Sequence, residues 1–187
     1  MIVDTAQGFK KANTKTDGRQ KVRKRWTPPD FGTVKLNVDG AFGKDGAAGI
    51  GMAVRDYKGE LIVAAFREVT NCRDATDSEL MAIEEGLNLA YTWTTQGISV
   101  ETDCLEAMEL IKESTPNTSI YAFRISVIRD LLRERVSSLV KISRDCTNVC
   151  HELAKMGRTM RLSQVWLGNY PSGISQAMEQ DCNFMIN

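Results

Sequence analysis

The sequence predicts an α/β fold in which a five-stranded mixed sheet carries helices on both faces. Two observations support this prediction. Three strand-like stretches joined by glycine turns come first, and segments with helical periodicity then alternate with two further strands. The resulting order is β-β-β-α-β-α-α-β-α, which joins an antiparallel meander to later strands through helices. Such an order implies a mixed sheet with helices packed on its faces.

Residues 1–25 are predicted to form a basic, disordered arm, because they show no apolar periodicity. Eight lysines and arginines against two aspartates give this arm a charge of +6, so the other 162 residues carry −6. The arm can supply phosphate contacts that the acidic body lacks, or it can be a solvated linker. We expect one folded domain over 26–168, opened by the prolines of Trp26-Thr27-Pro28-Pro29, and a C-terminal tail over 169–187.

The first three strands are predicted from period-two alternation and from the turns between them. Val34, Leu36 and Val38 alternate with polar residues in a half-buried strand that ends at Asp39. Glycine turns at 43–46 and 56–59 lead into strands over 47–54 and 61–69. These three strands form the expected antiparallel meander.

The remaining elements are predicted from the spacing of apolar residues. A helix over 78–93 carries a stripe of small apolar residues that can lie close on a sheet. A strand over 98–103, a short helix over 104–113 and a longer helix over 119–134 follow it. A fifth strand over 139–143 and a last helix over 147–156 complete the order.

Three carboxylates stand where a predicted strand ends or a predicted helix begins: Asp39, Glu79 and Asp103. Each has a structural explanation as well as a functional one. Asp39 precedes a glycine, as in many turns, and Glu79 completes a Thr76-x-x-Glu79 capping box. Asp103 can be the N-cap of the next helix. These alternatives stay open for each residue taken alone.

Taken together, the three acids favour a metal site. If the first and fourth strands are neighbours, the three side chains converge at one place beside the sheet. Carboxylates held close together repel one another unless a cation neutralises them. A divalent cation is therefore the expected ligand.

Seven motifs, in this order along the chain, resemble the type 1 ribonuclease H-like domain of the plant retroelement-derived, reverse-transcriptase-like group. The resemblance extends from Trp26 to Trp166-Leu167-Gly168-x-x-Pro171. The motifs are Trp26-x-Pro28-Pro29, Asn37-x-Asp39-Gly40-Ala41, Ala48-Gly49-x-Gly51, Val54-Arg55-Asp56-x-x-Gly59, Ser78-Glu79-x-x-Ala82, Glu101-x-Asp103-Cys104 and Leu153-Ala154.

The resemblance implies an enzyme that cuts the RNA strand of RNA–DNA hybrids with two Mg²⁺ ions, or with Mn²⁺ in their place. It implies that Asp39, Glu79, Asp103 and His151 are the catalytic and metal-binding residues. His151 stands where the family carries a fourth acid or a histidine. Imidazole suits Mn²⁺ better than Mg²⁺, and a surface histidine without a role is the alternative.

The sequence leaves two other functions open: a domain that binds hybrid without cutting it, and an interaction module that keeps the acids as turn and cap residues. Nucleic acid is the expected partner and a monomer the expected state. No apolar run approaches the roughly 20 residues of a membrane span, so no membrane partner is expected. The five cysteines lack metal-ligand spacing, which favours reduced thiols in an intracellular protein of the nucleus or cytoplasm.

Overall fold

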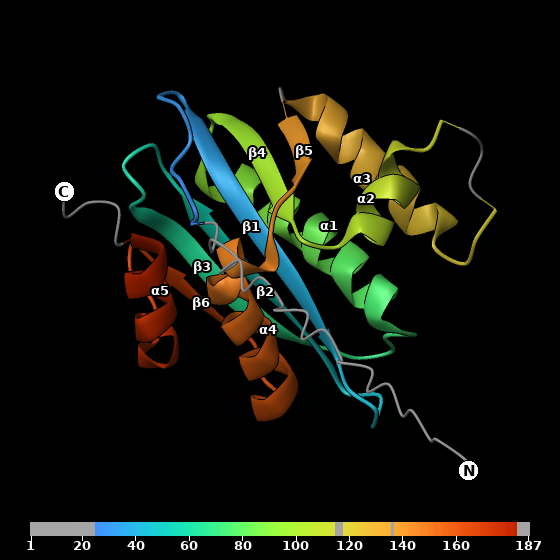
Figure 1. Cartoon of the computed structure of the whole chain (residues 1–187). Coiled ribbons are helices and arrows are strands. Elements are labelled where there is room, and N and C mark those ends of the chain that lie inside the picture. The colour runs from blue at the N-terminus through green and yellow to red at the C-terminus, as the bar shows by residue number, and fades with distance from the viewer. Residues whose placement is uncertain (1–24, 115–117, 136, 183–187) are drawn as a thin grey trace, which may run out of the picture.

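A computed structural model describes residues 25–114, 118–135 and 137–182 of the chain. Its centre is a six-stranded mixed sheet in the order β5-β4-β1-β2-β3-β6 (Figure 1). The strands are β1 (Thr33–Phe42), β2 (Ala48–Arg55), β3 (Leu61–Val69), β4 (Gly97–Thr102), β5 (Ser137–Lys141) and β6 (Gln164–Leu167). The helices are α1 (Ala75–Trp93), α2 (Leu105–Lys112), α3 (Ala122–Glu134), α4 (Asn148–Met160) and α5 (Ser175–Cys182), with 3₁₀ turns η1 (Arg144–Cys146) and η2 (Ser172–Ile174).

Helices cover both faces of the sheet, as predicted (Figure 1). On one face, α1 packs on β1 and β2, and α3 packs on α1; their apolar residues form the larger core. On the other face, α4 packs on β1, β2 and β3, and α5 packs on α4 over a smaller core. The α/β class and the mixed sheet are therefore confirmed. Among the helices that the structure describes, none combines the length and apolar character needed to cross a bilayer.

The prediction of five strands is wrong, because a sixth strand, β6, pairs antiparallel with β3 from Val63↔Leu167 to Phe66↔Gln164. This strand has four residues, and Val165 and Leu167 are exposed on the surface. Its sequence shows no alternation that would indicate a strand. Pairing with the edge of β3, a contact distant in sequence, defines it.

Within the described residues, the C-terminal end of the chain extends the fold beyond the predicted elements. The predicted arm lies outside the described residues except for Arg25, and Trp26 is buried. Within the predicted C-terminal tail, η2 and α5 are folded, and Ile174 and Met178 belong to the smaller core. Residues 183–187 lie outside the described part of the chain.

The pairing of β1 positions the site. β1 runs parallel to β4, and their last paired residues are Asn37 and Glu101. On its other side β1 continues antiparallel to β2 as far as Phe42. The predicted end of the first strand at Asp39 is therefore wrong, because β2 still pairs with β1 after β4 has turned away. The expected adjacency of the first and fourth strands is confirmed.

Two glycines of β2 allow α4 to lie directly on the sheet. A Cβ atom added to Gly51 would lie 2.2 Å from the Cys150 carbonyl oxygen and 2.5 Å from the Ala154 nitrogen. One added to Gly49 would lie 2.3 Å from the Arg158 nitrogen. Since these neighbours are helix backbone, they cannot move aside as a flexible side chain could. The small residues therefore fix the distance between α4 and the sheet.

We predict that Gly51→Ala lowers the free energy of unfolding by about 1–3 kcal/mol, because α4 must shift outward to admit the methyl group. Urea unfolding followed by circular dichroism measures the change. Gly173→Ala is the matched control, since the nearest atom to its added Cβ would be the flexible Met156 sulfur at 3.3 Å. Equal stability of the two variants would contradict the close contact.

Candidate metal centre

Asp39, Glu79 and Asp103 converge in the structure. Each offers one carboxylate oxygen, and these three oxygens lie within 4.8 Å of one another. The residues come from β1, α1 and the turn after β4, which are far apart in the sequence. The predicted convergence is therefore present, and the three acids can bind a metal ion together.

Asp39 lies on β1, two residues beyond the last residue that pairs with β4. Its side chain is 5% exposed and lies on the face of the sheet that α4 covers, where it contacts His151. It still pairs with Gly51 of β2. Asp39 is therefore a strand residue, and the alternative of a simple Asp-Gly turn does not apply.

Glu79 reaches Asp39 because α1 approaches β1 closely at Gly40. A Cβ atom on Gly40 would lie 2.6 Å from the Glu79 nitrogen and 2.6 Å from the Ser78 Oγ. Only glycine leaves room for the first turns of α1 at this position of the strand. Gly40 thus brings the Glu79 backbone beside the strand that carries Asp39.

The capping explanation for Glu79 is wrong. Helix α1 begins at Ala75, three residues before the predicted start, and its N-cap is Asp74, whose carboxylate accepts from the Asp77 N–H at 2.8 Å. Glu79 lies in the second turn, beyond the positions that cap a helix. Its Oε2 is buried and has no hydrogen-bond partner among the described residues. A buried carboxylate oxygen without a donor is a candidate cation ligand.

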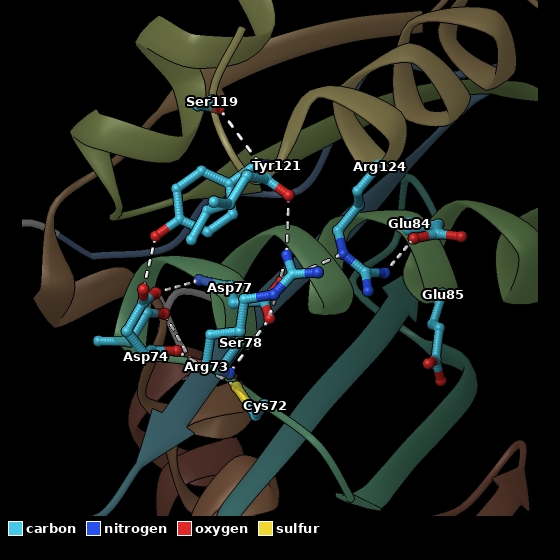
Figure 2. A network of polar contacts seen from close by, with 12 residues as sticks. Cys72, Arg73, Asp74, Asp77, Ser78, Glu84, Glu85, Ser119, Tyr121 and Arg124 are labelled. Atoms are coloured by element: carbon cyan, nitrogen blue, oxygen red, sulfur yellow. Dashed lines mark hydrogen bonds and ion pairs between the residues drawn. The ribbon is translucent and has the colours of Figure 1, made fainter.

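A polar network holds the N-terminus of α1 in place (Figure 2). The Tyr121 hydroxyl, just before α3, donates to Asp74 Oδ2 at 2.6 Å. Arg124 of α3 forms ion pairs with the buried Asp77, at 3.3 Å, and with Glu84. These contacts attach the turn that precedes Glu79 to a second helix. Sequence reasoning missed them because they join residues 40 or more positions apart.

Asp103 follows β4 directly, and α2 begins two residues later. The N-cap of α2 is Cys104, whose sulfur accepts from the Ala107 N–H at 3.4 Å. The alternative in which Asp103 caps the helix is therefore wrong, since a different side chain takes that place. The Asp103 carboxylate remains available to the three-acid cluster.

His151 lies in α4, where its Nδ1 is 3.1 Å from Asp39 Oδ2. The cluster of three carboxylates does not include it. The hydrogen bond to Asp39 raises the pKa of His151, although burial opposes this shift. The contact with Asp39 therefore favours the protonated form of the His151 imidazole. His151 is placed beside the three-acid cluster, and its role there stays a prediction.

The electrostatics of the cluster are those of carboxylates that resist ionisation. Burial is the largest cause that raises the pKa of Asp39, and the charge of Asp103 adds to it. Burial raises the pKa of Glu79 to about 9, and the charges of Asp39 and Asp103 contribute. Hard divalent cations such as Mg²⁺ and Mn²⁺ prefer such carboxylate oxygens. The buried, unpartnered Glu79 oxygen and this donor set fit a divalent cation.

Arg144 is a residue near the site to which sequence reasoning gave no role. It lies in η1, just before α4. Its positive charge opposes the rise in the pKa of both Asp39 and Glu79 without cancelling it. No motif marks it, since its proximity depends on how η1 joins β5 to α4. Arg144 therefore adds a second positive group, beside His151, to an otherwise acidic site.

The fold resembles solved ribonucleases H. RNase H1 from Halobacterium salinarum has a TM-score of 0.62 at 16% identity, over 67% of this chain and 96% of that one. LC11-RNase H1, isolated from compost by a metagenomic approach, was solved with an RNA/DNA hybrid and has a TM-score of 0.60 at 18% identity, over 68% of this chain and 98% of that one. The N-terminal RNase H domain of a Mycobacterium tuberculosis protein has a TM-score of 0.62 at 14% identity, over 68% and 94%.

These structures show that the fold is shared. No curated protein sequence matches the chain. A family model described as Reverse transcriptase-like matches residues 37–157, which is more than half of the chain and includes all three acids and His151. With its ribonuclease H-like sheet and its converging carboxylates, the chain belongs to the Reverse transcriptase-like family.

Proposed function

We propose that the protein hydrolyses the RNA strand of RNA–DNA hybrids in a metal-dependent, endonucleolytic reaction. The observation that carries this proposal is the convergence of the Asp39, Glu79 and Asp103 carboxylates within 4.8 Å on this fold. A similar structure, LC11-RNase H1, binds an RNA/DNA hybrid. The fold and the acids together support cleavage of the same class of substrate.

In this proposal Asp39, Glu79 and Asp103 hold two Mg²⁺ ions, with Mn²⁺ as the alternative. Two divalent cations supply an activated water and neutralise the charge that develops on the leaving oxygen of a phosphodiester. The protein itself contributes position and protonation. Gly40 and the Asp77–Arg124 pair hold Glu79 beside Asp39, and Glu79 must lose its proton before it can bind a cation.

His151 completes the proposed catalytic set from α4. In the metal-free protein its Nδ1 lies 3.1 Å from Asp39 Oδ2, and a protonated imidazole at this place takes part of the role of a cation. To act as a ligand it must lose its proton, and neutral imidazole favours Mn²⁺ over Mg²⁺. His151 therefore lowers the expected activity with Mg²⁺.

A second candidate function is binding of nucleic acid without cleavage. The His151–Asp39 contact favours it, because this hydrogen bond competes with a cation for the Asp39 carboxylate. The interaction-module alternative loses its support, since Glu79 and Asp103 do not cap their helices.

The basic arm and the folded domain have separate parts in this proposal. The basic arm over residues 1–25 supplies phosphate contacts, whose strength falls as salt rises. The folded domain over 26–168 acts as a monomer on nucleic acid, inside the cell in the nucleus or cytoplasm, without a membrane partner. Gel filtration with and without hybrid measures the apparent mass of the protein and so tests whether it is a monomer.

We predict that Asp39→Asn abolishes cleavage of a labelled RNA–DNA hybrid, because the amide removes a charge that at least one cation requires. The measurement is the initial rate with Mg²⁺ or Mn²⁺. Asp130→Asn is the matched control, since Asp130 is an exposed aspartate that pairs with Arg133 on the surface of α3. Binding of hybrid without cleavage by the wild-type protein would support the second candidate function instead.

We predict weak wild-type cleavage that is faster with Mn²⁺ than with Mg²⁺, and faster Mg²⁺-dependent turnover in His151→Asp. The aspartate replaces a poor ligand for Mg²⁺ by a good one and removes the imidazolium from Asp39. Steady-state rates in each metal measure both effects. An unchanged Mg²⁺ rate in the variant would show that His151 does not affect the metal site.

We predict that the metal-free protein loses stability as the pH rises toward 9. The pKa of Glu79 is raised from 4.5 to about 9 by folding, so the stabilisation is complete below about 4.5 and is lost as the pH rises through about 9. Urea unfolding between pH 6 and 9 measures the slope. Glu79→Gln should flatten it, and an equal slope in both proteins would contradict the raised pKa.

A further inference from the structure

Four motif residues that the proposed chemistry does not use meet in one buried network. Trp26, Asn37, Arg55 and Glu101 come from four different motifs of the sequence. Their exposed fractions are all 5% or less. Side chains of this polarity are buried at a cost unless they are paired, so the contacts among them require an explanation.

The centre of the network is a hydrogen bond between β1, which carries Asp39, and β4, which Asp103 directly follows. The Asn37 amide nitrogen of β1 donates to Glu101 Oε2 of β4 at 2.7 Å. Asn37 and Glu101 are also the last paired residues of the β1–β4 ladder. The bond therefore closes the ladder at its end.

Asp39 lies two residues after Asn37, and Asp103 lies two residues after Glu101. Side chains alternate along a strand, so residues 37 and 39 lie on one face of β1. The Cys150 thiol of α4 donates to the Asn37 carbonyl oxygen, and His151 of α4 contacts Asp39. The Asn37–Glu101 bond thus precedes the site on the same side of the sheet.

The bond lies beside a cavity at the surface of the sheet. Helix α4 packs on β1, β2 and β3. Beside it is a cavity of about 620 Å³, which is lined by Lys35, Glu101 and Ser143 and also by the buried Trp26. The Asn37–Glu101 bond therefore links β1 to β4 at the wall of this cavity.

Arg55 of β2 anchors the bond from the other side. Its guanidinium donates to Asn37 Oδ1 at 3.2 Å and to Asp181 Oδ2 of α5 at 3.0 and 3.1 Å. It also stacks on the Trp26 ring at 3.8 Å. Asn37 is thus held by one partner on each side, which fixes its orientation.

The charges of the network balance. Lys35 pairs with Glu101 at 2.7 Å, and Arg55 pairs with Asp181 at 3.0 Å. Two cations and two carboxylates leave no net charge to favour or oppose a metal ion nearby. The effect of the network on the site is therefore geometric.

We propose that Asn37 and Glu101 are positioning residues that hold Asp39 and Asp103 at the separation a cation needs. Without the bond, repulsion between these two carboxylates would spread the strands beyond the end of the ladder. This inference rests on the proposed function, because it assigns a spacing to the acids of the same site. Trp26 and Asp181, which lie outside the matched residues 37–157, support it through Arg55.

Asn37→Asp in the full chain tests the proposal. It keeps the acceptor for Arg55 but places a second carboxylate against Glu101. We expect Mn²⁺ affinity, measured by isothermal titration calorimetry, to fall about tenfold or more, as for other residues that orient ligands. Added negative charge alone would strengthen cation binding, so equal or tighter binding would overturn the proposal.

The double variant Asn37→Asp with Glu101→Gln restores the bond with donor and acceptor exchanged, and it has the same charge as the wild type. We expect it to recover Mn²⁺ affinity to within about threefold, since the geometry returns. If the double variant does not recover Mn²⁺ affinity, the loss in Asn37→Asp is not caused by breaking the bond between residues 37 and 101. Glu85→Gln is the control. It weakens the ion pair between Glu85 of α1 and Arg67 of β3, which lies away from the network. It should leave Mn²⁺ affinity unchanged, and an equal loss there would overturn the proposal.

Crystal structures without metal separate this inference from the proposed function. We expect the Asp39 and Asp103 carboxylates to lie farther apart in Asn37→Asp than in the wild type and the double variant. An unchanged separation would overturn the positioning role whether or not the protein binds Mn²⁺. A different result would overturn the proposed function and leave the positioning role standing. In that result the wild-type protein does not bind Mn²⁺, while the Asp39 and Asp103 carboxylates still move apart in Asn37→Asp.

Discussion

Repulsion among Asp39, Glu79 and Asp103 is the constraint on which the rest of the site depends. Folding brings one oxygen from each to within 4.8 Å of the other two. Burial makes the repulsion stronger, because water screens the charges less. Burial raises the pKa of Glu79 to about 9, and the charges of Asp39 and Asp103 add to this rise, so the metal-free site opposes a full set of charges. A divalent cation relieves this repulsion, so the same arrangement that opposes ionisation favours metal binding.

The fold holds the acids together through contacts that lie outside the cluster. Gly40 lets α1 lie against β1, and Gly51 does the same for α4 on β2. Arg124 and Tyr121 attach the start of α1 to α3. Asn37 and Glu101 close the β1–β4 ladder two residues before Asp39 and Asp103. Each contact acts on one element of the site, which is why residues from most of the chain bear on its geometry.

Sequence reasoning found the acids, the sheet class and the strand adjacency, because motifs and periodicity are local signals. It missed β6, which only its pairing with β3 defines, and the early start of α1, which Asp74 rather than Thr76 sets. It also gave no role to Asn37, Arg55 or Glu101. The Asn37–Glu101 and Arg55–Asp181 contacts join residues 64 and 126 positions apart, and no residue pattern along the chain shows which side chains meet.

A crystal structure of the full chain soaked in Mn²⁺, with anomalous scattering recorded for the metal, tests directly whether the three acids bind a divalent cation. We expect anomalous peaks within coordination distance of the Asp39, Glu79 and Asp103 carboxylates. Carboxylates in the same arrangement with no peak between them, while Mn²⁺ is bound elsewhere on the molecule, would contradict this expectation.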